Sequence, residues 1–166
     1  MRKLLFLVLS FIATIQIHAQ APINDDCTNA TPLTVNGDTL IFNNESTIID
    51  ATNPTCGGTN AIKDVWFSFV YAGGNISITS HLIGTLTDTR MALYSACGGN
   101  QLACNDDFGG TYASQINLGC ATLTLGATYY LQVGGYQSLT GTFGLSIVST
   151  PVVDCTNPNA SKYNAC

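Results

Sequence analysis

The chain of 166 residues is poor in basic side chains. Five Lys and Arg stand against ten Asp and Glu, and the formal net charge is −5 at pH 7. A protein that binds nucleic acid neutralises backbone phosphates with clustered cations, which this chain lacks. The same shortage disfavours anionic membrane surfaces. The composition therefore indicates neither nucleic acid nor membrane lipid as a partner.

Motifs for metal-thiolate sites and for common hydrolases are also missing. No Cys-x-x-Cys pair occurs among the seven cysteines, and His81 is the only histidine after residue 19, so a structural zinc site is not expected. Neither Gly-x-Ser-x-Gly nor His-Glu-x-x-His occurs. A hydrolase with paired carboxylates stays open as an alternative, but the acids fall in expected turns. We therefore expect a protein that is not an enzyme.

Only one long apolar run is present, and it lies at the N-terminus. The run from Leu4 to Ile15 follows Arg2 and Lys3 and precedes the small residue Ala19, which is the pattern of a signal peptide. Its dozen residues are too few for a membrane span, which needs about 20. We expect a signal peptide over residues 1–19, and a retained membrane anchor is the alternative.

The rest of the chain has strand patterns and no convincing helical period. Residues 64–71 and 127–136 are rich in aromatic and β-branched side chains, and residues 76–82 and 140–148 alternate apolar with polar. Asn36-Gly37-Asp38 predicts a hairpin between strands 32–35 and 39–42. Shorter strands are expected at 45–50, 89–95, 101–104, 113–118 and 120–125. The expected fold is an all-β, antiparallel two-sheet β-sandwich, jelly-roll-like.

Composition divides the chain into four parts. The signal peptide (1–19) is followed by a polar N-terminal arm at 20–31 and by the β-sandwich domain at 32–149. Residues 150–166 form a tail rich in Cys and Asn, without a strand pattern. We interpret this tail as the start of a small repeat that is truncated or incomplete here.

All seven cysteines follow the expected signal peptide, and in an exported chain this favours disulfides over metal thiolates. Spacing along the chain favours short loops. On this basis Cys120 is left over, and it is expected to be free, buried or paired outside the chain. The pairs that the spacing predicts are Cys97–Cys104, Cys27–Cys56 and Cys155–Cys166.

Several blocks in a fixed order resemble the bacterial pre-peptidase C-terminal domain, a jelly-roll-like β-sandwich attached to secreted proteases and other exported proteins. The resemblance covers about residues 24–148 and implies an accessory role in substrate or surface binding, solubility or secretion. It also implies calcium as a candidate ion, since some collagenase-associated members bind it. We expect the domain to follow the signal peptide directly, with no peptidase before it, which departs from the family. The tail resembles short cysteine repeats of exported Bacteroidetes proteins. The blocks are Asn24–Cys27, Asp64–Phe69, Asp88–Tyr94, Cys97–Gly99, Ala103–Asp107, Gly126–Tyr136 and Gly141–Ile147.

The acidic side chains Asp88, Asp106 and Asp107, with Asn105, form the candidate metal site. Calcium takes six to eight oxygen ligands, and extracellular calcium is abundant enough for weak sites. The alternative is that these side chains cap turns by hydrogen bonding to nearby backbone groups. No other cofactor is expected.

Exposed tyrosines are the candidate ligand-binding residues. Tyr112 and Tyr136 flank Gly-rich loops, whereas most other tyrosines are expected to fill the core or cap sheet edges. The sequence therefore predicts a secreted, non-catalytic module that binds an extracellular polysaccharide or protein surface. The alternatives are a structural or export-related accessory domain of a longer protein, such as a peptidase or hydrolase, and a hydrolase fragment.

Overall fold

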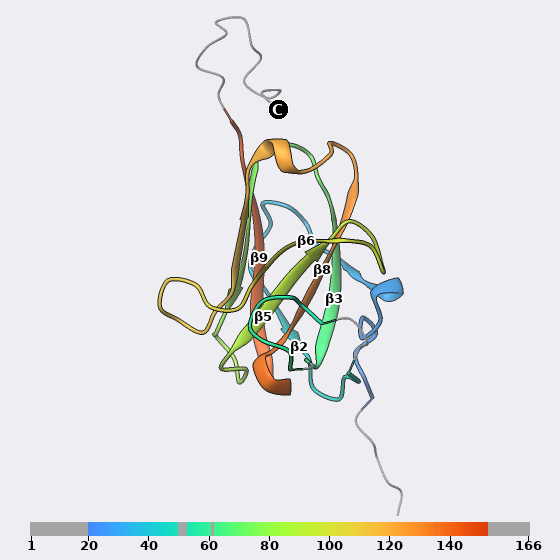
Figure 1. The fold of residues 1–166 in the computed structure, drawn as a ribbon, viewed down its shortest axis with the longest axis vertical. Helices are drawn as coiled ribbons and strands as arrows, with labels where there is room; N and C mark the ends of the chain where they lie inside the picture. Colours follow the sequence, from blue (N-terminus) through green and yellow to red (C-terminus); the bar gives the residue numbers. More distant parts are fainter. Residues whose placement is uncertain (1–19, 50–52, 61, 153–166) are drawn as a thin grey trace, which may run out of the picture.

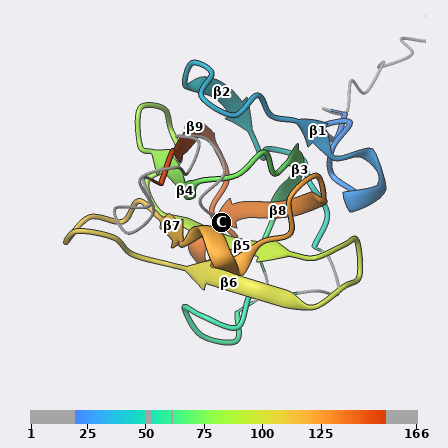
Figure 2. The ribbon, with the colours of Figure 1, turned by 90° about the horizontal axis from the view of Figure 1, so that it is seen from above.

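The computed structural model describes residues 20–49, 53–60 and 62–152. These residues form two β-sheets packed face to face, and the only helices among them are short 3₁₀ turns (Figures 1 and 2). The expected β-sandwich is confirmed. Within the described ranges, no helix has the length and hydropathy to cross a bilayer. The expected signal peptide and the predicted Cys155–Cys166 pair lie outside the described residues.

The larger sheet has five strands in the order β1-β3-β8-β5-β6, and the smaller has four in the order β2-β9-β4-β7. All neighbours are antiparallel except β1, which runs parallel to β3. The strands are β1 (Thr31–Pro32), β2 (Leu40–Asn43), β3 (Asp64–Val70), β4 (Asn75–His81), β5 (Thr89–Tyr94), β6 (Gln101–Asn105), β7 (Gln115–Leu118), β8 (Thr128–Gly135) and β9 (Thr142–Thr150).

The main core lies between the two sheets and is built from alternate residues of each strand. In the larger sheet Phe67, Leu131 and Leu93 lie side by side across β3, β8 and β5. Ile78 and Ile147 are paired across β4 and β9 in the smaller sheet. All five are buried. The period-two pattern of the sequence therefore identifies the inward face of these strands correctly.

The larger sheet is buried on its outer face as well. Trp66, Ala92 and Tyr94 form a second apolar cluster there. The N-terminal arm covers part of it, because the backbone N–H of Trp66 donates to the Asn24 carbonyl at 2.8 Å and the Asn24 amide donates back to the Trp66 carbonyl at 2.9 Å. Residues 53–60, called the strap below, cross the same face. Burial on both faces explains why β3 and β5 are almost continuously apolar.

Two disulfides fasten the N-terminal arm and the strap, and the pairing of their cysteines differs from the prediction. Cys27 bonds to Cys97, with Cα atoms 5.7 Å apart, and Cys56 bonds to Cys104, with Cα atoms 6.0 Å apart. The predicted pairs Cys97–Cys104 and Cys27–Cys56 are therefore wrong. Short sequence spacing was misleading because the arm and the strap each cross the sheet before they meet the β5–β6 hairpin. Cys120 is disulfide-bonded as well, so it is not a leftover thiol.

The predicted hairpin at Asn36-Gly37 is also wrong. A tight turn does occur there, with Asn36 at φ 62° and the Gly37 N–H donating to the Thr34 carbonyl at 3.2 Å. However, β1 before it and β2 after it belong to different sheets. The prediction of a turn was correct, but a turn alone does not determine which strands the segments before and after it pair with.

Two other expected strands are absent. Residues 45–49 contribute one isolated bridge, between Ile49 and Lys63, and residues 120–122 form a 3₁₀ turn. Near the first, the hydroxyl of Thr47 donates to the Asn44 carbonyl at 2.9 Å. Hydrogen bonds from a side chain to the nearby backbone stabilise a turn at the expense of strand pairing, and Ser, Thr and Asn form them readily.

Candidate functional site

The predicted site residues come from three separate segments, which meet at the end of the sandwich where β5 begins and β6 and β8 end. Asp88 directly precedes β5, Asn105 ends β6, and Tyr136 begins the 3₁₀ turn η3 (Tyr136–Ser138). The Tyr136 N–H donates to the Asp88 carbonyl at 3.3 Å, and the Thr89 N–H donates to the Tyr112 carbonyl at 2.9 Å. The structure therefore brings the acidic and the aromatic candidates to the same end.

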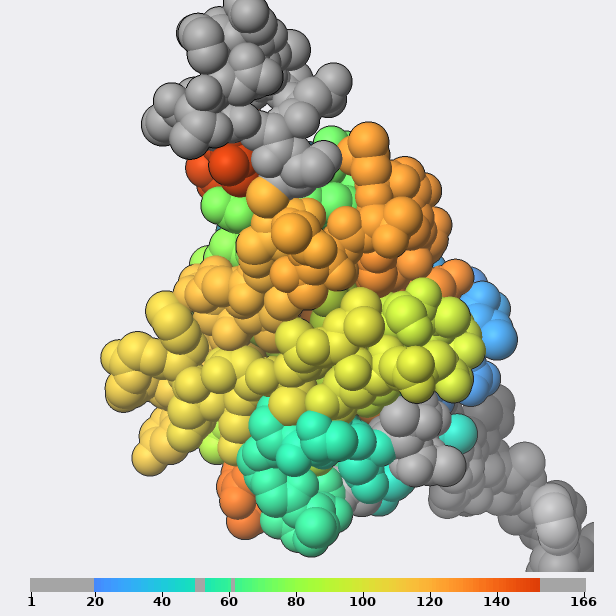
Figure 3. Space-filling view, turned by 45° about the horizontal axis from the view of Figure 1, so that its top comes forward, coloured from blue at the N-terminus to red at the C-terminus, as the bar shows by residue number. Residues whose placement is uncertain are grey.

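Residues 106–114 form a projecting loop between β6 and β7, called the finger below (Figures 1 and 3). Phe108 and Tyr112 on it are 45% and 63% exposed. At its tip the Thr111 N–H donates to the Phe108 carbonyl at 3.1 Å, and Gly109 and Gly110 have φ of 63° and 76°. Glycine permits this backbone at little cost. Sequence reasoning missed Phe108, although its place before Gly-Gly marks it as a loop aromatic.

The finger is fixed at its base by a buried hydroxyl network. Ser80, Thr89 and Ser114 are each at most 1% exposed. The hydroxyls of Ser80 and Thr89 lie 2.6 Å apart, and the Ser114 N–H donates to the Ser80 hydroxyl at 2.8 Å. The Ser114 hydroxyl lies 2.8 Å from the Asp106 carbonyl, to which it donates. These bonds hold the start and the end of the finger together, so its aromatic rings project from a rigid base.

Asp88, Asp106 and Asp107 lie at this end, and the pKa values of Asp88 and Asp106 are raised. Burial, followed by the charges of Asp106 and Asp107, raises the pKa of Asp88 to about 6. Burial and Asp107 also raise the pKa of Asp106, and Arg90 partly offsets this. The Oδ1 atoms of Asp88 and Asp106 are buried without a hydrogen-bond partner in the described structure. A bound cation would relieve both the repulsion and the missing bonds.

Asn105 holds a turn. The Gln115 N–H donates to its Oδ1 at 2.8 Å, and its Nδ2 donates to the Asp107 carbonyl at 3.1 Å. This is the turn-capping role that the sequence left open as the alternative. No group of three or more His, Cys, Asp or Glu side chains within the described ranges is placed to hold a metal ion. Calcium binding stays a prediction, with Asp88 and Asp106 as its main candidate ligands.

Arg90 is a central residue that sequence reasoning missed, because a single basic residue within a strand pattern carries no signal of burial. It is fully buried beneath the strap. Its guanidinium donates to the carbonyls of Pro54 at 2.9 Å and Asn60 at 3.1 Å. Gly57 (φ 71°) lets the strap lie close, since a Cβ there would lie 2.5 Å from the Asp106 carboxyl carbon. Figure 3 shows the strap packed beneath the β6 segment.

A polar network continues from Arg90 along the outer face of the larger sheet. Gln132 donates to Asp64 at 2.8 Å and accepts from the Tyr94 hydroxyl at 2.9 Å. Burial and the charge of Asp64 raise the pKa of Tyr94 to about 12, with Arg90 acting in the opposite direction. Gly134 lies between Asp64 and Arg90 in the register. These side chains are buried, so the network supports the fold beneath the candidate site and does not itself contact a ligand.

The raised pKa of Asp88 predicts a pH dependence of stability. Its folded pKa of about 6 lies above the ordinary value of 3.8, so the folded protein holds this proton more tightly than the unfolded chain. The free energy of unfolding should therefore fall as the pH rises from about 4 to about 6. Urea unfolding across this range measures the slope. Asp88→Asn should reduce it, whereas Asp38→Asn, at an exposed carboxylate, should not. An unchanged slope in Asp88→Asn would contradict the assignment.

The chain is similar to a known protein family and to several solved structures. Residues 23–147 match the model of a T9SS-associated family described as galactose binding domain-like. Among solved structures, the pre-peptidase C-terminal domain of a collagenase from Bacillus anthracis is similar, with 18% identity and a TM-score of 0.44. The similarity covers 71% of this chain and 93% of that domain. No curated protein matches the chain.

Proposed function

The chain belongs to the T9SS-associated galactose binding domain-like family, and on this premise we propose that it is a non-catalytic, extracellular carbohydrate-binding module. The family association and the disulfides indicate an exported protein. The ligand site of the proposal is the end of the sandwich that carries the finger, Tyr136 and the three carboxylates. Loops at the end of a rigid sandwich commonly carry binding sites.

The observation that carries the proposal is the exposure of Tyr112 and Phe108 on a rigid finger. An exposed ring can stack on the apolar face of a sugar while its edge stays in water. The finger is already ordered by its own hydrogen bonds, so little conformational entropy is lost when a ligand binds. Asp88, Asp106 and Asp107 supply acceptors for sugar hydroxyls beside it. Aromatic contact and polar orientation are the two components of a small-ligand site.

We expect Tyr112→Ala to weaken binding to galactose-containing polysaccharides by about tenfold, the equivalent of about 1.4 kcal/mol. Affinity electrophoresis in gels that contain each polysaccharide measures the effect. Leu125→Ala is the matched control, since Leu125 is equally exposed, at 65%, and lies in the turn before β8. If wild-type protein is not retained by any polysaccharide tested, the proposal fails, and the structural or export-related accessory role is favoured.

Calcium is a second element of the proposal, supported by the buried, unpartnered oxygens of Asp88 and Asp106. Calcium at ten times its Kd should raise the free energy of unfolding by about 1.4 kcal/mol. Thermal melting with calcium and with a chelator measures this shift. Asp106→Asn should abolish it, and Glu45→Gln, at an exposed acid elsewhere, should leave it. Melting curves of the wild type that coincide with and without calcium would rule the site out.

A further inference from the structure

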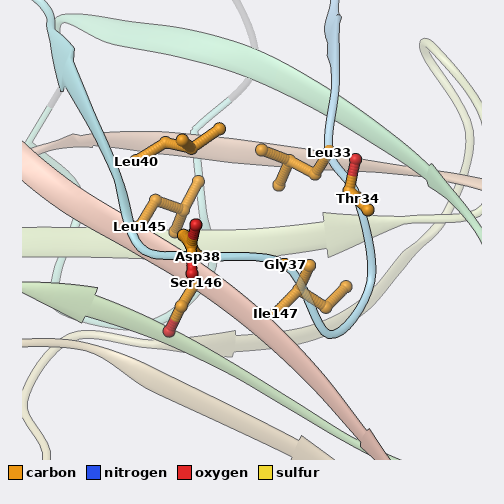
Figure 4. Close-up of a pocket in the computed structure, with 8 residues that line it drawn as sticks. All are labelled: Leu33, Thr34, Gly37, Asp38, Leu40, Leu145, Ser146 and Ile147. Carbon is orange, nitrogen blue, oxygen red and sulfur yellow. The ribbon is translucent and has the colours of Figure 1, made fainter.

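A pocket of about 220 Å³ opens at an edge of the sandwich, between β9 and the loop that joins β1 to β2. Figure 4 shows Leu33 and Leu40 pointing toward each other from the two limbs of this loop. Its remaining lining residues are Thr34, Gly37, Asp38, Leu145, Ser146 and Ile147. Since Leu145 and Ile147 also belong to the main core, the pocket is a slot into the side of the core.

The loop is held in place by β9. The Asn36 N–H donates to the Ile147 carbonyl at 2.9 Å, and the Ser149 N–H donates to the Asn36 side-chain oxygen at 2.7 Å. Below these bonds, β2 pairs with β9 from Leu40↔Leu145 onward. The pocket therefore lies between the point where the loop bonds to β9 and the point where β2 begins to pair with the same strand.

The walls and the rim of this pocket differ in chemistry. Leu33 and Leu40 supply the accessible aliphatic surface of the pocket, and the core residues Leu145 and Ile147, which are 1% and 2% exposed, lie behind them. Asp38 supplies the only charge among the lining residues; it is exposed, and its carboxylate bonds to no side chain or backbone group in the described structure. Ser146 is already engaged, since its hydroxyl lies 2.9 Å from Nε2 of His81. A ligand for this pocket combines an apolar stem with a cationic end.

We propose that this edge pocket binds a lysine side chain of a partner polypeptide. The four-carbon stem of lysine would lie between Leu33 and Leu40, and its ammonium group would meet the Asp38 carboxylate at the rim. The net charge of −5 favours approach of a basic partner. Arginine pairs with a carboxylate as well, but its aliphatic stem is one methylene shorter than that of lysine and covers less of the apolar side chains. This site is separate from the finger and does not depend on the carbohydrate proposal.

The test is a titration of methyl-labelled full-length protein, followed by NMR, with three capped tripeptides of the form Gly-X-Gly. X is lysine, norleucine or Nε-acetyl-lysine. The last two keep the aliphatic stem of lysine but lack its positive charge. We expect the lysine peptide to shift the methyl signals of Leu33, Leu145 and Ile147, with a Kd on the order of 1 mM. The two neutral peptides should bind about fivefold more weakly, in line with one exposed ion pair.

Two variants complete the test. Asp38→Asn should remove the preference for lysine, and Glu45→Gln, which removes an exposed acid outside the pocket, should preserve it. Equal binding of lysine and norleucine peptides would overturn the proposal, as would shifts confined to residues away from the pocket. Free butylammonium should bind more weakly than the lysine peptide if a polypeptide is the partner. Equal affinity would overturn the assignment of the lysine to a polypeptide.

Discussion

Replacing Cys27 and Cys97 together by Ala is expected to lower the free energy of unfolding by about 4 kcal/mol. The bond joins residues separated by 70 positions, and closing a loop of this length removes much conformational entropy from the unfolded chain. The double variant Cys56→Ala/Cys104→Ala, with a separation of 48, should cost a similar amount. Urea unfolding of each oxidised variant measures the loss.

The pairing can be tested with the same residues. The variant Cys27→Ala/Cys56→Ala removes one cysteine from each bond, so both native disulfides are lost. If the sequence-based pairs were correct, that variant would lose one bond and keep the other. Thiol titration under denaturing conditions, with peptide mapping, distinguishes the two arrangements. A stability loss of less than 1 kcal/mol in Cys27→Ala/Cys97→Ala would contradict the stabilising role given to this bond.

Arg90→Ala is expected to destabilise the domain by about 3 kcal/mol or more. Arg90 is fully buried, and its loss leaves the carbonyls of Pro54 and Asn60 without their donor beneath the strap. Asp106 also loses the positive charge that limits the rise of its pKa. Buried acceptors without partners account for most of the cost. Chemical denaturation measures it.

Arg90→Lys separates charge from geometry. A lysine keeps the positive charge but cannot reach carbonyls on two sides as a planar guanidinium does. We expect it to recover less than half of the lost stability. Full recovery would show that charge alone matters at this position. The strap should also become more accessible in Arg90→Ala, which faster amide hydrogen exchange at residues 53–60 would report.

The sequence was sufficient to predict the sandwich because its inward faces follow a simple period. The alternation at 76–82 predicts Ile76, Ile78 and Leu82 on one face, and that at 140–148 predicts Phe143, Leu145 and Ile147 on one face. All are buried except Leu82, which is half-buried. The pairing of strands was harder. The Asn36 turn predicted a hairpin, but Thr31↔Phe67 and Leu40↔Leu145 place its two arms in different sheets. Which sheet a strand joins depends on long-range packing, which local turn chemistry does not record.

Much of the candidate site was visible in the sequence, because acids and tyrosines in Gly-rich loops are easily recognised. The structure shows that Asp88, Asp106, Tyr112 and Tyr136 share one end of the molecule. What could not be predicted is how these residues are supported. Arg90 reads as an ordinary charged strand residue, and its burial follows only from a strap that is distant in sequence. The disulfides were mispaired for the same reason.

Both covers of the larger sheet depend on bonds that form only under oxidising conditions. In a reducing cytoplasm the arm and the strap would be held by hydrogen bonds alone, such as those of Asn24 to Trp66 and of Arg90 to Pro54, so Trp66 and Arg90 would be more often exposed to water. We therefore expect the newly made chain to reach the export machinery with this face still loosely held, and to be sealed after translocation. Bond formation would then serve as a maturation step that ties the final shape of the domain to its arrival outside the cell.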